Sequence, residues 1–255
     1  MFTSIKEYQF LFEELVKRDF KKKYKRTILG MLWSILSPLM MLVILALIFG
    51  NFFSHNTEHY IIYLFTGQIV FNYYVESTIE GMNSLSSNAH IFSKINIPKY
   101  LFLLSKNISS FINFFLILII YFIFLIIDDI SFNWSFILLF YPITCLILMN
   151  IGIGLILSAL FIFFKDIEYI YRLFTQIVMY GSAIFYNTDI LPPYIQNLFL
   201  LNPLYVCIKY IRTVVIQNTI PDIFIHLLLL IYSVILLTVG ILIYKKYNYK
   251  FIYYI

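Results

Sequence analysis

Long stretches without charge constrain this chain more than any other feature of its sequence. Seven of them contain no Asp, Glu, Lys or Arg, and they cover residues 27–57, 59–75, 107–127, 130–164, 173–188, 190–208 and 223–244. An apolar segment of about 18 residues is long enough to cross the hydrocarbon core of a membrane. Charged residues make up 12% of the chain, whereas soluble domains contain about 25%. The sequence therefore predicts an all-α membrane protein and excludes a soluble fold.

The distribution of Lys and Arg selects six spans from these stretches. Basic residues gather in the short cytoplasmic segments of membrane proteins. With both termini in the cytoplasm, six spans leave only Lys209 and Arg212 of the 18 basic residues outside. A full seventh span over residues 190–208 would instead put the basic C-terminal tail outside. The six predicted spans cover residues 32–53, 60–81, 101–127, 136–164, 172–186 and 223–244.

The apolar segment between the fifth and sixth spans is interrupted by proline. Pro192, Pro193, Pro203 and Pro221 divide it into two pieces, near residues 194–201 and 204–217. At 1.5 Å per residue these pieces reach about 12 and 21 Å, less than the roughly 30 Å of a hydrocarbon core. We predict two short re-entrant helices that dip in from the outer face.

This re-entrant pair, residues 191–217, is a candidate gate that includes Lys209 and Arg212. Irregular backbone at membrane depth is tolerated where it is buried in protein or lines a watery cavity. The alternative is a pair of simple helices that lie in the outer interface.

A dense basic cluster precedes the first span. Seven Lys and Arg residues fall within residues 17–26. Apolar residues recur every four positions on the other side, at Tyr8, Phe12, Val16, Phe20, Tyr24 and Ile28. This spacing predicts an amphipathic helix over residues 1–28 that lies in the membrane interface, with its basic face toward anionic lipid. A nucleic-acid binder would have no use for the apolar run that follows, so no nucleic-acid partner is expected. The transmembrane domain then covers residues 29–255.

Three blocks of sequence carry a resemblance to a known family. They are LGMLWSILSPL at the first span, the pair Asp166 and Ile167, and FYNTDILPPYIQNLFLLNPL before the last span. Through these blocks, and in the order of its other features, nearly the whole chain resembles the permease subunits of ABC-2 type transporters. The members it resembles export polysaccharides such as O-antigen, teichoic acid or capsule.

The resemblance implies a transport subunit rather than an enzyme. It implies a homodimer of six-span subunits around a central channel in the bacterial plasma membrane, and a lipid-linked polysaccharide as substrate. Two copies of a separate ATPase subunit would bind ATP and Mg²⁺, so this chain would need no cofactor. Residues 87–98 would form a coupling helix in a groove of the ATPase, and residues 191–217 would correspond to the family's outer gate helices.

The residues themselves agree with a partner ATPase. No two of the eight glycines are five positions apart, so the chain has no G-x-x-x-x-G-K-[ST] phosphate loop. The loop 87–98 combines the apolar Ile91, Phe92 and Ile95 with Lys94. This composition suits a small helix that docks through an apolar anchor and a charged rim.

Candidate channel-lining residues lie on the second and fifth spans. Glu76 and Glu80 are acidic residues inside a span, and their spacing puts both on one helix face. They line the inner entrance of the channel or take part in proton coupling, or else they lie at the cytoplasmic interface. Flat aromatic rings suit a sugar chain that slides past, and belts at the membrane interfaces are the alternative. The aromatic candidates are Tyr73, Tyr74, Tyr180, Phe185 and Tyr186.

Two other functions remain open from the sequence. One is a drug or small-lipid exporter of the same broad type. The other is a membrane-embedded glycan-modifying enzyme, which needs acid and base groups that converge at one face. The outer groups available to such an enzyme are scattered over short loops: Glu58, Asp128, Asp129, Asp189, Asp222, His55 and His59. The dispersed histidines, together with Cys145 and Cys207, predict no metal site.

Overall fold

Every element that the structure describes is helical. The computed structural model describes residues 8–25, 27–53 and 59–254. The α-helices are α2 (Gln9–Tyr24), α3 (Leu32–Phe53), α4 (Tyr60–Asn83), α5 (Ala89–Phe92), α6 (Tyr100–Ile127), α7 (Phe140–Phe163), α8 (Ile167–Tyr180), α9 (Pro193–Phe199), α10 (Pro203–Val215) and α11 (Ile223–Tyr247). The short 3-10 helices are η2 (Ser86–Asn88), η3 (Trp134–Leu139), η4 (Thr188–Ile190) and η5 (Lys250–Tyr253). These residues contain no strand, which confirms the all-α fold.

Four helical segments are long and apolar enough to cross a membrane, and they coincide with four of the six predicted spans. They are residues Leu32–Gly50 of α3, α6, the continuous run Trp134–Phe163 formed by η3 and α7, and α11. The pair α9 and α10 would make a fifth candidate if it counted as one span, but the two helices bend by 107° at their break. Two separate short helices were predicted here, and their bounds agree with the prediction to within two residues.

The two other predicted spans correspond to α4 and α8, which differ from the apolar helices for separate reasons. α4 has 24 residues and is about 36 Å long, but it is less apolar because protein covers most of it. Its buried side chains include Thr66, Gln68, Ser77 and Thr78. α8 has only 14 residues, about 21 Å of helix. The predicted bounds 172–186 for this span are wrong, because the helix begins at Ile167 and the chain leaves it at Gly181.

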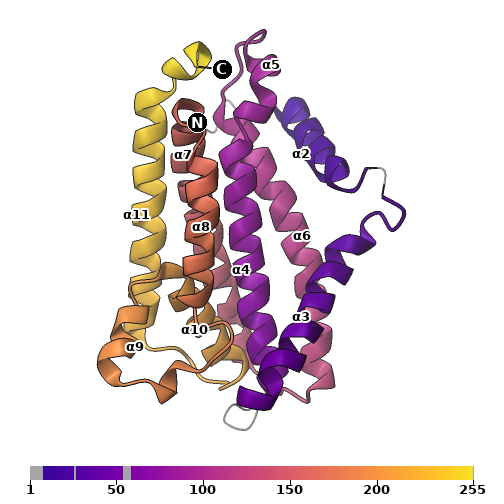
Figure 1. Ribbon diagram of the computed structural model, residues 1–255, viewed down its shortest axis with the longest axis vertical. Helices are drawn as coiled ribbons and strands as arrows, with labels where there is room; N and C mark the ends of the chain where they lie inside the picture. The colour runs from indigo at the N-terminus through magenta and orange to yellow at the C-terminus, as the bar shows by residue number, and fades with distance from the viewer. Residues whose placement is uncertain (1–7, 26, 54–58, 255) are drawn as a thin grey trace.

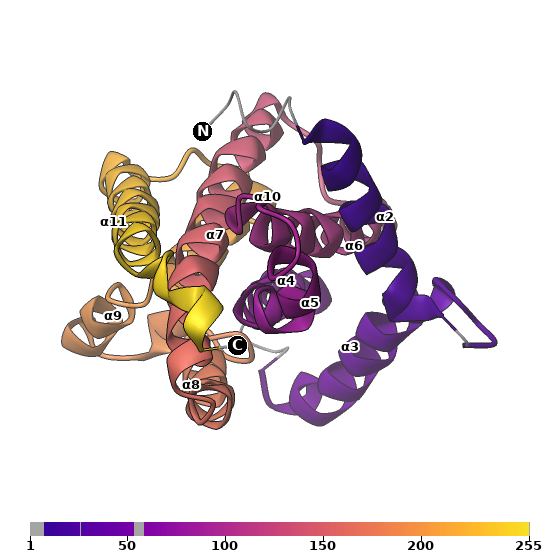
Figure 2. The ribbon, with the colours of Figure 1, turned by 90° about the horizontal axis from the view of Figure 1, so that it is seen from above.

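The helices form a bundle with two distinct ends. Figure 1 shows α2, α5 and the C-terminus at one end, and α9 with α10 at the opposite end. Seen along the bundle in Figure 2, α4 is central and α3, α6, α7 and α8 surround it. The larger apolar core lies around α4, α6, α7 and α10. A smaller core near α2 and α5 includes Phe92, Phe102 and Phe251.

The helix α2 packs against protein as well as presenting a basic surface. Leu15 and Asp19 are buried, and Tyr8 and Phe12 pack against the smaller core. Part of the face that was predicted to meet lipid therefore meets the rest of the chain. A continuous helix over residues 8–28 is also wrong, because Lys25 is extended and Gly30 has a φ of +52°. Residues 1–7, which complete the predicted helix, lie outside the described residues.

Glycines allow the backbones of α7 and α11 to touch. A Cβ atom on Gly152 would lie 2.5 Å from the carbonyl oxygen of Leu236. A Cβ atom on Gly240 would collide with the carbonyl oxygen of Gly152. Small residues are common where membrane helices approach this closely, because packing rather than hydrophobicity holds them together.

Alanine at Gly152 should therefore separate the two helices. Overpacking of this kind costs about 1–3 kcal/mol, so Gly152→Ala should lower the thermal unfolding temperature of the purified protein in detergent. Gly50→Ala in α3 is the matched control, because a Cβ atom there meets nothing within 4 Å. The control should be neutral or slightly stabilising, since alanine is the better helix former. Equal unfolding temperatures for Gly152→Ala and wild type would contradict the contact.

Candidate functional site

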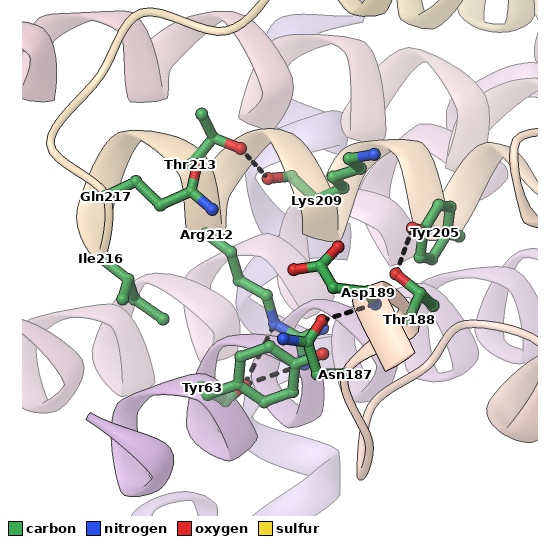
Figure 3. A pocket seen from close by; sticks show the side chains of 10 residues that line it. All are labelled: Tyr63, Asn187, Thr188, Asp189, Tyr205, Lys209, Arg212, Thr213, Ile216 and Gln217. Carbon is green, nitrogen blue, oxygen red and sulfur yellow. Dashed lines mark hydrogen bonds between the residues drawn. The ribbon is translucent and has the colours of Figure 1, made fainter. Parts of the chain in front are cut away.

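The segment between α8 and α11 builds a cavity at one end of the bundle. The cavity has a volume of about 250 Å³ and mostly polar side chains around it (Figure 3). Its lining residues are Tyr63, Asn187, Thr188, Asp189, Tyr205, Lys209, Arg212, Thr213, Ile216 and Gln217. They come from α4, from η4 and the residue before it, and from α10 and the two residues after it. The predicted gate residues Lys209 and Arg212 therefore lie together in this cavity.

Local sequence determines where the two short helices begin. Pro193 and Pro203 stand at the first positions of α9 and α10, where the missing N–H and the fixed φ of proline are favourable. The side chain of Asn202 accepts a hydrogen bond from the backbone N–H of Leu204 and so caps α10. Pro192 precedes α9 and holds an extended conformation. The prolines identified in the sequence thus define both helix starts.

Arg212 holds this end of the molecule together. Its side chain is buried, and its guanidinium carbon lies 3.3 Å from the ring centroid of Tyr63. The guanidinium donates hydrogen bonds of 2.9–3.0 Å to the backbone oxygens of Tyr63, Ala183 and Ile184. Ala183 and Ile184 are buried in the non-helical turn after α8, where backbone carbonyls need hydrogen-bond donors. Arg212 supplies those donors and joins α10 to α4 and to the turn.

Gly67 makes room for this arrangement. A Cβ atom at position 67 would lie 2.9 Å from Nη2 of Arg212 and 3.0 Å from the side chain of Ile184. The prediction from sequence selected Arg212 as part of a gate but missed Gly67 and Tyr63. A basic residue inside an apolar segment was the available signal for Arg212, because such residues are rare in membranes and need partners.

The predicted channel-lining aromatics occupy different environments. Tyr73 and Tyr74 are buried in the core of this chain, and the ring of Tyr73 stacks on Phe114. Phe185 is also buried and stacks on Phe49 with 5.0 Å between ring centroids. Tyr186 is half-buried and donates a hydrogen bond to the backbone oxygen of Tyr180.

Tyr180 is the exposed member of this group of candidates, at 59% exposure. A channel-lining role for the group stays a prediction, and Tyr180 is the side chain best placed to face a neighbouring molecule.

Glu76 and Glu80 lie on one face of α4, as predicted, and both are paired with lysine. Lys23 from α2 lies 2.9 Å from Glu76, and Lys106 from α6 lies 2.8 Å from Glu80. Asn113 donates a further hydrogen bond to Glu76. These partners explain how a largely apolar helix tolerates two carboxylates. The sequence prediction missed the lysines, although Lys106 lies inside a predicted span.

A polar network continues from these ion pairs to the loop before α5. Asp19 is buried, accepts a hydrogen bond from Ser105 and lies 3.8 Å from Lys106. Arg18 binds Asp19 at 2.7 Å and also donates to Asn88 at 2.7 Å. Asn88 immediately precedes α5, within the predicted coupling loop. The network therefore connects α2, α6 and the coupling loop.

Within the coupling loop, only part of the predicted docking set faces outward. Phe92 is buried against Phe102, whereas Ile95 is 58% exposed and Lys94 is exposed. Ile91 is half-buried. Phe92 therefore anchors the loop to its own chain, and Lys94 and Ile95 remain available for a partner.

Lys99, at the end of the same loop, donates to the backbone oxygen of Asn248. Partial burial lowers the pKa of Lys99 below its ordinary value, because desolvation disfavours the charged amine.

Among the described residues, two of the groups that an enzyme could use lie close together. His59 and Asp128 lie 2.7 Å apart and join the start of α4 to the end of α6. His55 and Glu58 lie outside the described residues. In the part of the chain that the structure describes, no three His, Cys, Asp or Glu side chains gather as metal ligands.

Known proteins are similar to this chain over most of its length. A sequence profile of the family described as ABC-2 type transporter matches residues 11–216. Two proteins named O-antigen export system permease protein RfbA, both from Klebsiella pneumoniae, are 27% and 28% identical over 251 residues, which is 95% of this chain and 95% of each relative. An RfbA permease from Myxococcus xanthus is 22% identical over 220 residues, 85% of this chain and 84% of the relative.

Arg212→Lys should loosen the cavity end although it keeps the charge. A lysine amine cannot replace a planar guanidinium that binds several carbonyls and stacks on a ring. Charged hydrogen bonds contribute about 1.5–3 kcal/mol, so the unfolding temperature in detergent should fall clearly. Gly67→Ala should produce a similar fall by displacing the guanidinium. Lys209→Gln, one turn earlier on α10, serves as the control and should change little. A stable Arg212→Lys variant would show that the carbonyl contacts are dispensable.

Proposed function

Because this chain belongs to the ABC-2 type transporter family, we propose that it is the membrane-spanning subunit of an ATP-driven exporter that moves a lipid-linked polysaccharide across the bacterial plasma membrane. The observation that carries the proposal is the similarity to O-antigen export permeases over 95% of both chains. Similarity from end to end supports a shared role better than a match confined to one segment. The all-helical bundle with several membrane-length apolar helices is consistent with that role.

The working transporter in this proposal is a homodimer of the chain with two copies of a separate ATPase subunit. The chain itself carries no phosphate loop, so ATP and Mg²⁺ belong to the partner. The outward side chains of Lys94 and Ile95 would contact the ATPase. The network from Asn88 through Arg18 and Asp19 would carry motion of the loop to α2 and α6.

The proposed topology has six spans with both termini in the cytoplasm. α3, α4, α6, α7 and α11 each have the length to cross, and α8 together with its following turn makes the remaining span. The polar side chains of α4 face other helices rather than lipid. The helices α9 and α10 enter from the outer face and leave on the same side, as their 107° bend allows.

Replacement of the outward loop residues should abolish export without unfolding the protein. Lys94→Glu combined with Ile95→Ala changes exposed side chains, and such changes usually cost less than about 0.5 kcal/mol. Cells that carry this variant should lose surface polysaccharide and accumulate it inside. Co-purification of the ATPase should also decrease.

Two further variants separate docking from stability. Phe92→Ala should lower the unfolding temperature instead, because truncation of a buried Phe costs about 3–5 kcal/mol. Thr219→Glu with Ile220→Ala, at the opposite end of the bundle, should leave export and co-purification unchanged. Unaltered surface polysaccharide together with altered drug sensitivity in the loop variant would favour the drug exporter instead.

Labelling of single cysteines tests the topology. In a background with Cys145 and Cys207 replaced by Ser, cysteine at Asn133 or Thr219 should react with an impermeant thiol reagent in intact cells. Cysteine at Asn96 or Asn248 should react only after the cells are opened. These four positions are exposed, so a missing reaction reflects the membrane rather than burial. Labelling of Asn248→Cys from outside would contradict the six spans.

A further inference from the structure

Two adjoining cavities lie on the flank of the bundle, between α2, α3, α4 and α6. The first has a volume of about 250 Å³ and is lined by charged and hydroxyl side chains, among them Lys22, Lys106, Ser109 and Ser110. The second has about 650 Å³, and Trp33 belongs to its mainly apolar wall. Lys23 and Glu76 line both cavities, so the two form one cleft with a polar and an apolar half.

Three lysines and three carboxylates line the polar half, and Arg18, which lies outside the lining, adds a fourth cation. Each of its three carboxylates has a cation beside it: Asp19 has Arg18, Glu76 has Lys23 and Glu80 has Lys106. Among the described residues no carboxylate forms an ion pair with Lys22. Lys22 is thus a surplus cation at the cleft, and it favours an anionic occupant.

The apolar half has the character of a membrane-exposed groove. α3, α4 and α6 form its walls, and its apolar lining includes Phe71, Val75 and Ile117. A volume of 650 Å³ lies within the range of about 300–1,000 Å³ that small-molecule sites occupy. A molecule that fits both halves must have an anionic head and an apolar body, which is the composition of a lipid.

We propose that this cleft binds one anionic lipid molecule whose headgroup is a terminal phosphate, with no cationic group attached to it. The phosphate contacts Lys22, Lys23 and the hydroxyls of Ser109 and Ser110, and the apolar chain lies along Trp33 and Val75. The phosphate competes with Glu76 for Lys23, because both anions face the same amine. This site does not depend on which molecule the protein exports, so it can fail while the proposed function stands.

Because Glu76 competes with the phosphate for Lys23, two variants of this ion pair should change lipid affinity in opposite directions. Lys23→Gln and Glu76→Gln both remove the same ion pair, and a purely structural pair would make them behave alike. If a lipid phosphate binds here, the two variants should change the lipid affinity in opposite directions. Lys23→Gln removes a ligand and should weaken lipid binding, whereas Glu76→Gln removes the carboxylate that competes for Lys23 and should strengthen it.

The fluorescence of Trp33 can be used to measure lipid binding in the cleft. The chain has two tryptophans, and Trp134 lies at the opposite end with 88% exposure, so Trp134→Phe leaves Trp33 as the single emitter. Phosphatidic acid with brominated chains is titrated into the purified full-length protein in detergent, and quenching of Trp33 is measured. Quenching should saturate, and phosphatidylcholine with the same chains should quench only weakly. Equal, unsaturated quenching by both lipids would overturn the proposal.

The variants and competitors then test each half of the cleft. A basic residue near an anionic surface contributes about 1 kcal/mol, so Lys22→Gln and Lys23→Gln should each weaken binding about fivefold. Lys21→Gln, exposed and outside the cleft lining, should leave it unchanged. Glu76→Gln should tighten binding even though loss of its ion pair lowers the unfolding temperature. Equal effects of Lys21→Gln and Lys22→Gln, or parallel effects of Lys23→Gln and Glu76→Gln, would refute the site.

Competition identifies the source of the phosphate. Unbrominated undecaprenyl phosphate should restore the fluorescence of Trp33 by displacing the brominated lipid. Inorganic phosphate at the same concentration should not, since it has no apolar body. Equal displacement by inorganic phosphate would show that only the polar half binds, and the lipid assignment would be wrong.

Discussion

The hydrogen bonds of Arg212 are the interaction on which one whole end of this protein depends. A chain that leaves a helix inside a protein must find other donors for its buried carbonyl oxygens. In the turn after α8, the guanidinium of Arg212 binds those of Ala183 and Ile184. Arg212 thereby joins α10 to α4 and to the turn, while the prolines define where α9 and α10 begin. One buried cation thus supplies the donors for the turn that follows α8.

At the opposite end of the bundle, ion pairs attach α2 to the rest of the chain. α2 approaches the bundle with many lysines, and α4 presents two carboxylates to it. The pairs Lys23–Glu76 and Lys106–Glu80, together with the buried Asp19, fix α2 against α4 and α6. The same residues line the cleft, so the interactions that attach α2 also determine which molecules the cleft attracts. The charges that attach α2 to the bundle are therefore the same charges that would bind a molecule in the cleft.

The sequence predicted the fold well where a single physical rule decides the structure. Four spans and the two proline-started helices follow from apolar length and from the backbone of proline. It also placed a helix at residues 60–81, where α4 covers Tyr60–Asn83. It failed at α8, which covers Ile167–Tyr180 rather than residues 172–186. Arg212 from α10 binds the turn that follows α8, and this contact is not visible from local composition.

The candidate site was predictable only in part, for a similar reason. An acidic residue inside an apolar span indicates that a partner exists, which is why Glu76 and Glu80 were selected, whereas Arg212 was selected as part of the re-entrant pair. It does not say which residue the partner is, because Lys23, Lys106 and Tyr63 are distant in sequence. Phe92 shows the converse, since an apolar residue in a loop can equally anchor its own chain or a neighbour, and here it packs on Phe102.

The touching backbones of α7 and α11 also restrict how this molecule can move. Two helices in contact at Gly152 and Gly240 have no layer of side chains between them to deform, so neither can roll or slide independently. They behave as a single rigid frame. The freedom to move is then left to α3, which follows the left-handed Gly30 and has most of its side chains exposed or half-buried. A cycle of opening and closing would displace α3 while α7 and α11 stay together.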